Sequence, residues 1–237
     1  MDLYEVLTDS VDSSATVERI IRGEAWTAAQ LDDGSFGIAI SLSLDTRPRI
    51  FKSLIGLKAK DAAQAVRSWN LSEASEAMAV INACLNTPSR IERLSAAGEY
   101  ELKSTHDMDI TGKKCAVIGH MSRQAEALRG ADEVYIIERA PKDGDYPDSA
   151  CEYLLPQCDI VVITASALVN KTMPRLLELA KNAKTVILGP TAPLCPELKS
   201  LGVYRISGMA VTDIIGFEDW MMRVKGNPYP FGRVFEI

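Results

Sequence analysis

Short apolar runs alternate with helical stretches through the second half of the chain. The first run, residues 113–118, ends at Gly119-His120. A stretch of helical composition, residues 121–130, separates it from a second run that ends in Glu138. Further strands are predicted over residues 159–164, 185–188 and 203–206, with helices over 149–155, 173–181, 196–201 and 209–223. Five strands that alternate with helices predict an α/β fold, with a parallel sheet and helices on both of its faces.

Ligands bind open α/β sheets at the topological switch point, where the loops after neighbouring strands separate. In the usual strand order 3-2-1-4-5, this point lies between the first and the fourth predicted strands. The crevice is therefore expected beside Gly119-His120 and the loop Gly189-Pro190-Thr191. Three prolines between residues 190 and 196 stiffen that loop, which favours a rigid binding wall over a mobile lid.

The first half of the chain has a different pattern, which predicts a separate α+β domain. Apolar residues at mostly helical spacing predict one helix over residues 1–22, with a break allowed at residues 12–14. Two strand-like runs, 25–31 and 36–44, are joined by Asp32-Asp33-Gly34-Ser35, which is typical of a hairpin. We expect this domain to span residues 1–105 and the parallel domain to span residues 106–237, with His106 in the polar linker.

A short helix over residues 60–68 precedes a longer one that begins at Asn70, a candidate N-cap residue with an acid three positions later. Asn82 and Asn86 lie one turn apart on one edge of the longer helix. Asparagine has poor helix propensity in mid-helix, which favours a function for Asn82. Asn86 lies near the end of the helix, where capping and ligand binding are equally good explanations.

Composition and charge exclude several classes of protein. The chain of 237 residues is 47% hydrophobic and 24% charged, as in folded globular proteins. A net charge of -6 and a pI near 5.1 argue against nucleic acid and against an anionic membrane surface as partners. The N-terminus lacks the pattern of a signal peptide, so we expect a cytoplasmic protein. The five cysteines form no Cys-x-x-Cys pair, and of these only Cys195 lies in a loop that chemistry could use.

The ends of the predicted strands carry small or polar residues that are candidates for ligand binding. With the two asparagines, they are Gly119, His120, Glu138, Thr164, Ser166, Asn170, Gly189, Pro190, Thr191, Gly208 and Asp213. Four of them also have a simpler explanation: His120 and Asn170 as helix caps, Glu138 as a solvated strand end, and Asp213 as a surface acid one turn into the last helix.

The candidate chemistry disfavours two common ligands. A dinucleotide fingerprint would need glycine at Met121 and Gln124, and without it the backbone cannot approach a pyrophosphate closely, so NAD is disfavoured. The chain has two histidines, and only His120 lies at the predicted rim, with Asp213 and Cys195 as candidates to join it. A tight site made by protein alone normally needs three or four converging ligands, so we expect no tightly bound metal of this kind.

Several motifs in this order resemble those of a family of uncharacterised prokaryotic proteins usually called the putative heavy-metal chelation family. The resemblance covers nearly the whole chain and rests on residues 80–86, 117–120, 159–164, 168–170, 189–194 and 207–208, followed by Asp213. It implies an N-terminal domain like that of enolase, a Rossmann-like C-terminal domain and a site in the cleft between them. Enolase chemistry is not implied, because the metal-bearing barrel of enolases has no counterpart in this sequence.

The sequence therefore predicts a protein that binds a small polar or metal-chelating molecule in this cleft, with chemical modification of that molecule left open. Asn82 and Asn86 are expected on one wall, facing the rim residues of the parallel sheet on the other. The alternative is an enzyme that uses a nucleotide or adenosyl cofactor, and a scaffold without a small ligand is a third reading. A metal chelate is one candidate ligand, and assembly into a homo-oligomer is left open.

Overall fold

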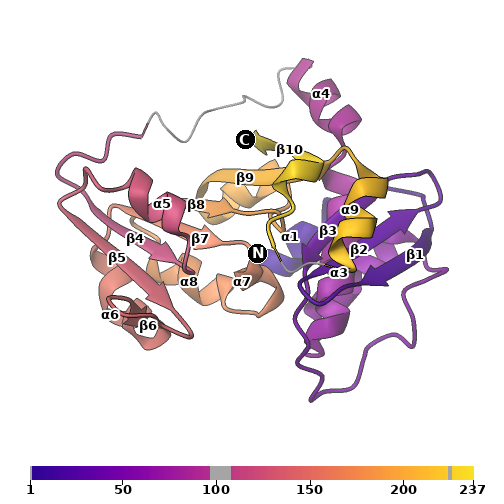
Figure 1. Ribbon diagram of the computed structural model, residues 1–237, viewed down its shortest axis with the longest axis horizontal. Coiled ribbons are helices and arrows are strands. Elements are labelled where there is room, and N and C mark those ends of the chain that lie inside the picture. Colours follow the sequence, from indigo (N-terminus) through magenta and orange to yellow (C-terminus); the bar gives the residue numbers. More distant parts are fainter. Residues whose placement is uncertain (1, 97–107, 224–225) are drawn as a thin grey trace.

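The computed structural model describes residues 2–96, 108–223 and 226–237. Their strands form a three-stranded sheet of order β1-β2-β3 and a seven-stranded sheet of order β10-β9-β8-β7-β4-β5-β6 (Figure 1). The small sheet is antiparallel, and the large one is parallel except for its β9–β10 pair. The predicted α/β class with an antiparallel first half is confirmed. His106 and the predicted boundary at residue 105 lie outside the described residues.

The first half contains a helix, a meander of three strands and a helical layer. Its elements are α1 (Leu3–Asp9), β1 (Val17–Arg22), β2 (Trp26–Leu31), β3 (Phe36–Ile40), α2 (Ala59–Ala63), η1 (Gln64–Arg67), α3 (Leu71–Leu85) and α4 (Pro88–Ala96). The hairpin prediction is confirmed, and Gly34 supplies a left-handed φ of 84° at its turn. The N-cap prediction is also confirmed, because the Asn70 side chain accepts a hydrogen bond from the Glu73 N–H.

The prediction of one helix over residues 1–22 is wrong. Helix α1 ends at Asp9, and Ile20 and Ile21 belong to β1, where they pair with Ala29 and Ala28 of β2. In so short an apolar segment, the spacing of apolar residues cannot distinguish a helix from a strand. Residues 17–22 form a strand because they pair with β2 of the hairpin.

The second half is the large sheet with its connections. Its elements are β4 (Lys114–Ile118), α5 (Ser122–Ala127), β5 (Glu133–Glu138), β6 (Tyr146–Pro147), η3 (Asp148–Ala150), α6 (Cys151–Leu154), η4 (Leu155–Gln157), β7 (Ile160–Thr164), α7 (Ser166–Val169), α8 (Met173–Leu179), β8 (Lys184–Leu188), η5 (Pro196–Leu201), β9 (Val203–Val211), α9 (Ile214–Met221), η6 (Tyr229–Phe231) and β10 (Gly232–Glu236). Cys115 and Val117 pack in a cluster with Leu128, and Ala116 between them belongs to the larger core on the other face.

The predicted switch point is misplaced by one strand. β4 lies between β5 and β7, so the chain reverses its winding between β4 and β7, and not between β4 and β8. The prediction failed because it missed β6, an edge strand of two residues, Tyr146–Pro147, that pairs with β5. No apolar run in the sequence marks so short a strand. With β6 counted, the order from β6 to β9 is the doubly wound 3-2-1-4-5-6.

The last helix begins later than predicted. β9 continues to Val211 because β10 pairs with its second half, from Ser207 to Val211. Gly208 therefore lies inside a strand, and α9 starts at Ile214.

The two halves interlock at both ends of the chain. Helix α9 packs on the small sheet, and one apolar cluster joins the two: Trp26, Ala28, Phe36, Ile38, Met209, Val211, Phe217 and Met221 (Figure 1). In the other direction, α1 contacts η5, and the Tyr4 hydroxyl donates a hydrogen bond of 2.9 Å to the Leu168 carbonyl. Within the described part of the chain, we find no helix of the length and apolar character that a membrane span requires.

Candidate functional site

A pocket of about 470 Å³ opens at the switch point of the large sheet. Its walls come from the ends of β4, β5 and β7 and from the helices α6, α7 and α8, and we call it the switch-point pocket. Five residues predicted from the sequence line it: Gly119, Glu138, Thr164, Ser166 and Asn170. The pocket lies where the corrected strand order places the crevice.

Gly119 brings the ends of β4 and β7 close together. Its φ is 99°, and a Cβ at this position would lie 3.0 Å from Thr164 Cγ2. Glycine is required here by both the backbone conformation and the space. The Thr164 hydroxyl lies 3.1 Å from the Ser166 hydroxyl, so two adjacent hydroxyls line this wall.

The acid at the end of β5 is held by backbone groups. Glu138 accepts a hydrogen bond of 2.9 Å from the His120 N–H and one of 2.6 Å from the Arg139 N–H. Glu138 thus ties the turn after β4 to the end of β5, and each carboxylate oxygen already has one donor.

Asn170 lies in the turn before α8. Its Oδ1 accepts hydrogen bonds from the Thr172 N–H and from the Thr172 hydroxyl, at 3.1 and 2.6 Å. The N-cap position of α8 is Thr172, so the simpler reading of Asn170 as the cap of that helix is wrong. Asn170 instead forms a local turn and also lines the switch-point pocket.

Lys171, which the sequence reasoning missed, is the most unusual residue of this wall. Its φ of 71° is the one positive value among the described non-glycine residues. Its ammonium donates to the Val66 carbonyl of the first half and lies 4.9 Å from the centre of the Tyr4 ring. Burial lowers the pKa of Lys171 to about 8. No periodic pattern marks such a residue, because its environment comes from the packing of the two halves.

Asn82 and Asn86 do not line this pocket. Both are buried, and their amides bind backbone groups: those of the second half and, for Asn82, also one of β3. Asn82 Nδ2 donates to the carbonyls of Ile38 and Thr191, at 2.8 and 3.0 Å. Asn86 Nδ2 donates to the carbonyls of Ala192 and Met209, at 2.8 and 3.1 Å, while Asn86 Oδ1 accepts from the Leu194 N–H at 2.8 Å. These hydrogen bonds give the two asparagines a structural role at the junction of the halves.

The loop after β8 belongs to the same junction. The Thr191 hydroxyl accepts a hydrogen bond of 2.9 Å from the Ile40 N–H of β3. Gly189 and Pro190 lead into this buried segment, with a φ of 120° at Gly189. A Cβ on Gly208 would lie 2.5 Å from the Ala192 carbonyl oxygen, so β9 also passes close to the loop. The loop faces the first half of the chain and does not line the switch-point pocket, so the prediction that it forms a wall of that crevice is wrong.

The remaining candidates lie apart from the switch-point pocket. His120 Nδ1 is 2.9 Å from Asp145 Oδ2, and the Lys142 N–H together with this ring lowers the pKa of the Asp145 carboxyl. Asp213 is the N-cap of α9, where its side chain accepts from the Gly216 N–H at 2.9 Å; the expectation that it lies one turn inside the helix is wrong. Burial raises the pKa of Cys195 to about 12, so this thiol is a poor nucleophile near neutral pH.

The side chains around the pocket do not fit a directly bound metal ion. Among the described residues, no three His, Cys, Asp or Glu side chains converge on one point. Glu138 is held by two N–H groups, and Glu152 pairs with Arg175 at 2.6 Å. A tight transition-metal site needs more free ligands than this arrangement supplies.

A second pocket, also of about 470 Å³, lies between the halves. The first half contributes Leu44, Thr46, Arg47, Trp69 and Leu71, and the second contributes Arg139 and Asn170. Arg139 and Asn170 also line the switch-point pocket, so the two pockets adjoin. We call the second one the interdomain pocket.

Comparisons with known proteins find relatives without an assigned activity. A crystal structure of a protein of unknown function from the DUF364 family of Desulfitobacterium hafniense is 32% identical, with a TM-score of 0.84 over 99% of this chain and 96% of that one. A second such structure, from Pyrococcus horikoshii, is 24% identical with a TM-score of 0.80, over 100% and 99% of the two chains, and shows the fold. An uncharacterized protein of Methanocaldococcus jannaschii, MJ0500, is 38% identical over 109 residues, which span 43% of this chain and 42% of that relative.

Family-level similarity covers both halves. Residues 4–85 and 104–227 each match a family described as "Putative heavy-metal chelation". The second match alone spans more than half of the chain, and the Desulfitobacterium structure agrees with it over nearly the full length. The chain therefore belongs to the "Putative heavy-metal chelation" family, as its sequence motifs predicted.

Proposed function

We propose that the protein binds a small, polar, metal-chelating molecule in the switch-point pocket, with the interdomain pocket as the adjoining part of one site. The observation that carries this proposal is the pocket of about 470 Å³ at the switch point, lined by five of the residues that the sequence nominated. Its size lies within the range of pockets that hold small ligands, roughly 300–1,000 Å³.

The side chains of the pocket suit a ligand rich in oxygen and nitrogen. Thr164 and Ser166 offer hydroxyls that can donate and accept, and Asn170 offers an amide. Ile118, Ile137 and Leu176 supply apolar surface beside them. Because Glu138 and Glu152 are already paired and Asp148 alone cannot make a tight metal site, a metal would enter as part of a chelate whose organic portion the protein recognises.

A nucleotide or adenosyl cofactor is the second candidate, and one observation favours it. Gly119 and Glu138 stand at the ends of the first two parallel strands, where related folds hold a ribose. Against it, the Glu138 oxygens already accept two backbone hydrogen bonds, and Met121 and Gln124 replace glycines of the phosphate-binding turn.

Binding measurements separate these candidates. Calorimetry with Ni²⁺ alone, with pyridine-2,6-dicarboxylate alone and with their preformed complex tests the first, and titration with S-adenosylmethionine and NAD tests the second. We expect the complex to bind, and the Thr164→Val variant to bind it about 10-fold more weakly through loss of a hydroxyl contact. Thr111→Val, at an exposed position, is the matched control.

Elemental analysis of protein purified without chelators decides the role of the metal. About one transition-metal ion per chain, held without any added chelator, would contradict the proposal and establish a direct protein site. Tight binding of the adenosyl compound, without binding of the complex, would favour the second candidate.

A further inference from the structure

The interdomain pocket combines an exposed aromatic ring with two arginines. Trp69 keeps 67% of its surface exposed, although it borders a concave site, and Leu44 beside it is 55% exposed. Arg47 and Arg139 approach this pocket from opposite halves of the chain. Within the described residues, neither guanidinium forms an ion pair or hydrogen bond, although several other arginines are paired with acids.

The acids nearest in sequence to these arginines are occupied elsewhere. Asp45 accepts hydrogen bonds from the Ser72 N–H and hydroxyl, at 3.3 and 3.0 Å. Glu138, next to Arg139, is held by two backbone N–H groups. Among the described residues that line the interdomain pocket there is no acid, so this part of a chain of net charge -6 is locally cationic. Such a pocket attracts anions.

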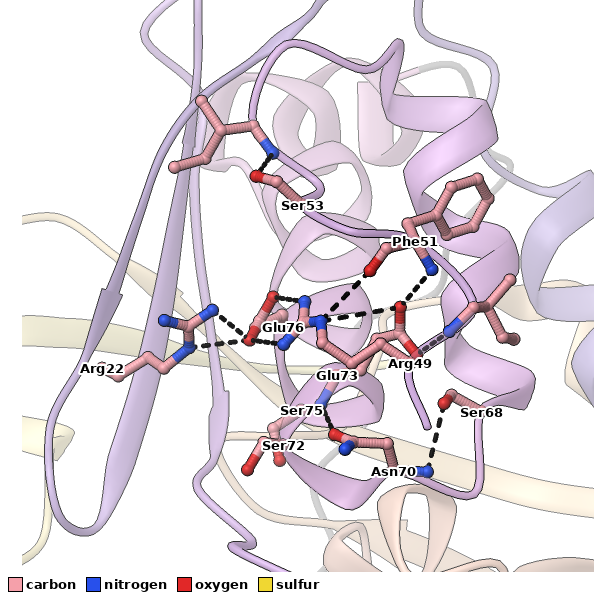
Figure 2. Close-up of polar contacts among 12 residues, drawn as sticks. Arg22, Arg49, Phe51, Ser53, Ser68, Asn70, Ser72, Glu73, Ser75 and Glu76 are labelled. Atoms are coloured by element: carbon pink, nitrogen blue, oxygen red, sulfur yellow. Dashed lines mark hydrogen bonds and ion pairs between the residues drawn. The ribbon is translucent and has the colours of Figure 1, made fainter. Parts of the chain in front are cut away.

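The segment that follows Arg47 is held on the first turns of α3, where Glu73 and Glu76 bind Phe51 and Arg49 (Figure 2). Glu73 accepts from the N–H groups of Ile50 and Phe51, at 2.7 and 2.8 Å. Glu76 binds both Arg22 and Arg49, the latter at 2.6 Å.

Two further contacts hold the segment that contains Arg47. Asn70 Nδ2 donates to the Arg47 carbonyl at 3.0 Å, and the Leu71 N–H donates to the Leu44 carbonyl at 3.0 Å. This loop is therefore organised before a ligand arrives, which lowers the entropic cost of binding.

From these contacts we infer that the interdomain pocket recognises a planar ring that carries an anionic group, a carboxylate or a phosphate. The ring stacks on Trp69, and Arg47 and Arg139 bind the anion from the two halves of the chain. Arginine suits this task because its planar fork matches carboxylate and phosphate oxygens. The inference rests on the proposed function, since it names the chemical class of the molecule that reaches from the interdomain pocket past Asn170 into the switch-point pocket.

Calorimetry with a matched set of probes tests the class. Pyridine-2,6-dicarboxylate has the ring and the charge, pyridine-2,6-dicarboxamide keeps the shape without the charge, and glutarate keeps the charge without the ring. We expect the first to bind at least about 10-fold more tightly than either of the others. The affinity of AMP relative to that of adenosine measures the contribution of a phosphate. The affinity of AMP relative to that of the dicarboxylate shows which anion the site prefers. Binding of the charged probes should weaken as salt rises.

Variants test the residues. Arg47→Gln and Arg139→Gln should each weaken the dicarboxylate about 10-fold, Trp69→Ala about 10-fold, and Trp69→Phe much less. Arg129→Gln, at an exposed arginine paired with Glu126, is the control that removes a charge elsewhere. Ligand quenching of tryptophan fluorescence should disappear in Trp69→Phe, because Trp26 is buried and Trp220 packs on Phe217 and Phe231, and neither lines the interdomain pocket.

The outcomes separate this inference from the proposed function. If the metal complex binds the wild type and depends on Thr164 but not on Trp69, Arg47 or Arg139, the inference is wrong and the proposed function stands. Equal affinity for the dicarboxylate and the dicarboxamide, or no binding of either the dicarboxylate or AMP at millimolar concentration, would also overturn the inference. If the complex fails to bind the wild type, the proposed function itself fails, whether or not the free metal binds.

Discussion

At the scale of single residues, the asparagines of α3 show how tertiary contacts decide the role of a side chain. Asn86 binds two carbonyls and one N–H group from three different residues of the second half. A buried amide fits there because it alone among neutral side chains of its size has both a donor pair and an acceptor. The sequence marks the position as unusual but does not reveal which groups the amide meets.

Replacement of Asn86 by alanine should reduce stability. The Asn86→Ala variant removes the buried amide that binds the carbonyls of Ala192 and Met209 and the N–H of Leu194, which should cost about 2–4 kcal/mol. Urea denaturation measures the loss, with Asn227→Ala, at an exposed turn, as the control. Unchanged stability together with lost ligand binding would instead support the ligand role considered from the sequence.

Lys171 should give the protein a specific pH dependence. Its pKa is about 8 in the folded chain and near the ordinary 10.5 when unfolded, so both states bind the proton below about pH 8. Between pH 8 and 10.5 the unfolded chain binds more protons, and the free energy of unfolding contributed by Lys171 therefore rises with pH, by about 1–3 kcal/mol in total.

The comparison between wild type and Lys171→Met isolates this effect. Buried thiols act in the opposite direction, because burial raises the pKa of Cys115 from 9 to about 11 and stability is lost as pH rises above 9. Urea denaturation at pH 7.5 and 9.5 should show the wild type gaining stability relative to the variant. The exposed Lys181→Met variant should show no such change, and a constant difference between wild type and Lys171→Met would refute the prediction.

At the scale of elements, the contact of β3 with α3 depends on one glycine. A Cβ on Gly37 would lie 2.5 Å from the carbonyl carbon of Asn82 and would also collide with the backbone of Ala79 and Ala83. The strand can lie on the helix only because residue 37 has no side chain. This close packing also places Ile38 where Asn82 binds its carbonyl.

Two glycines of the same hairpin should therefore respond differently to alanine. Gly37→Ala should cost about 3 kcal/mol or more, because helix backbone cannot move aside. Gly34→Ala has open space around its Cβ and should cost only about 1 kcal/mol, from the left-handed φ of 84°. Chemical denaturation of both variants measures the loss in free energy of unfolding. Equal losses would show that α3 shifts to make room for the added methyl group.

At the scale of the whole molecule, each half of the chain contributes a helix that packs on the other half. Helix α9 covers the apolar face of the small sheet through Phe217, and Arg19 of β1 pairs with Glu218 at 2.5 Å. Helix α1 packs against the second half, where the Tyr4 hydroxyl binds the Leu168 carbonyl. The predicted division into residues 1–105 and 106–237 thus separates segments that share one core.

This interlocking predicts a single cooperative unfolding transition. Calorimetry of the full chain should give one transition, with the calorimetric and van't Hoff enthalpies equal. Phe217→Ala should lower the temperature of that transition as a whole, since it removes a buried ring from the shared cluster. Two resolved transitions, of which only one responds to this variant, would show that the halves fold independently.

The features that the sequence determined by itself are local ones, formed by residues close together in the chain. The hairpin, the Asn70 cap, the parallel strands and the polar residues at their ends follow from periodicity and from residue types at element ends, which depend only on neighbours in the chain. Strand order, the partners of Asn82 and Asn86, the environment of Lys171 and the adjoining pockets depended on tertiary structure. The physical reason is that each of them joins groups far apart in sequence, whose meeting is decided by strand pairing and by the packing of one half on the other.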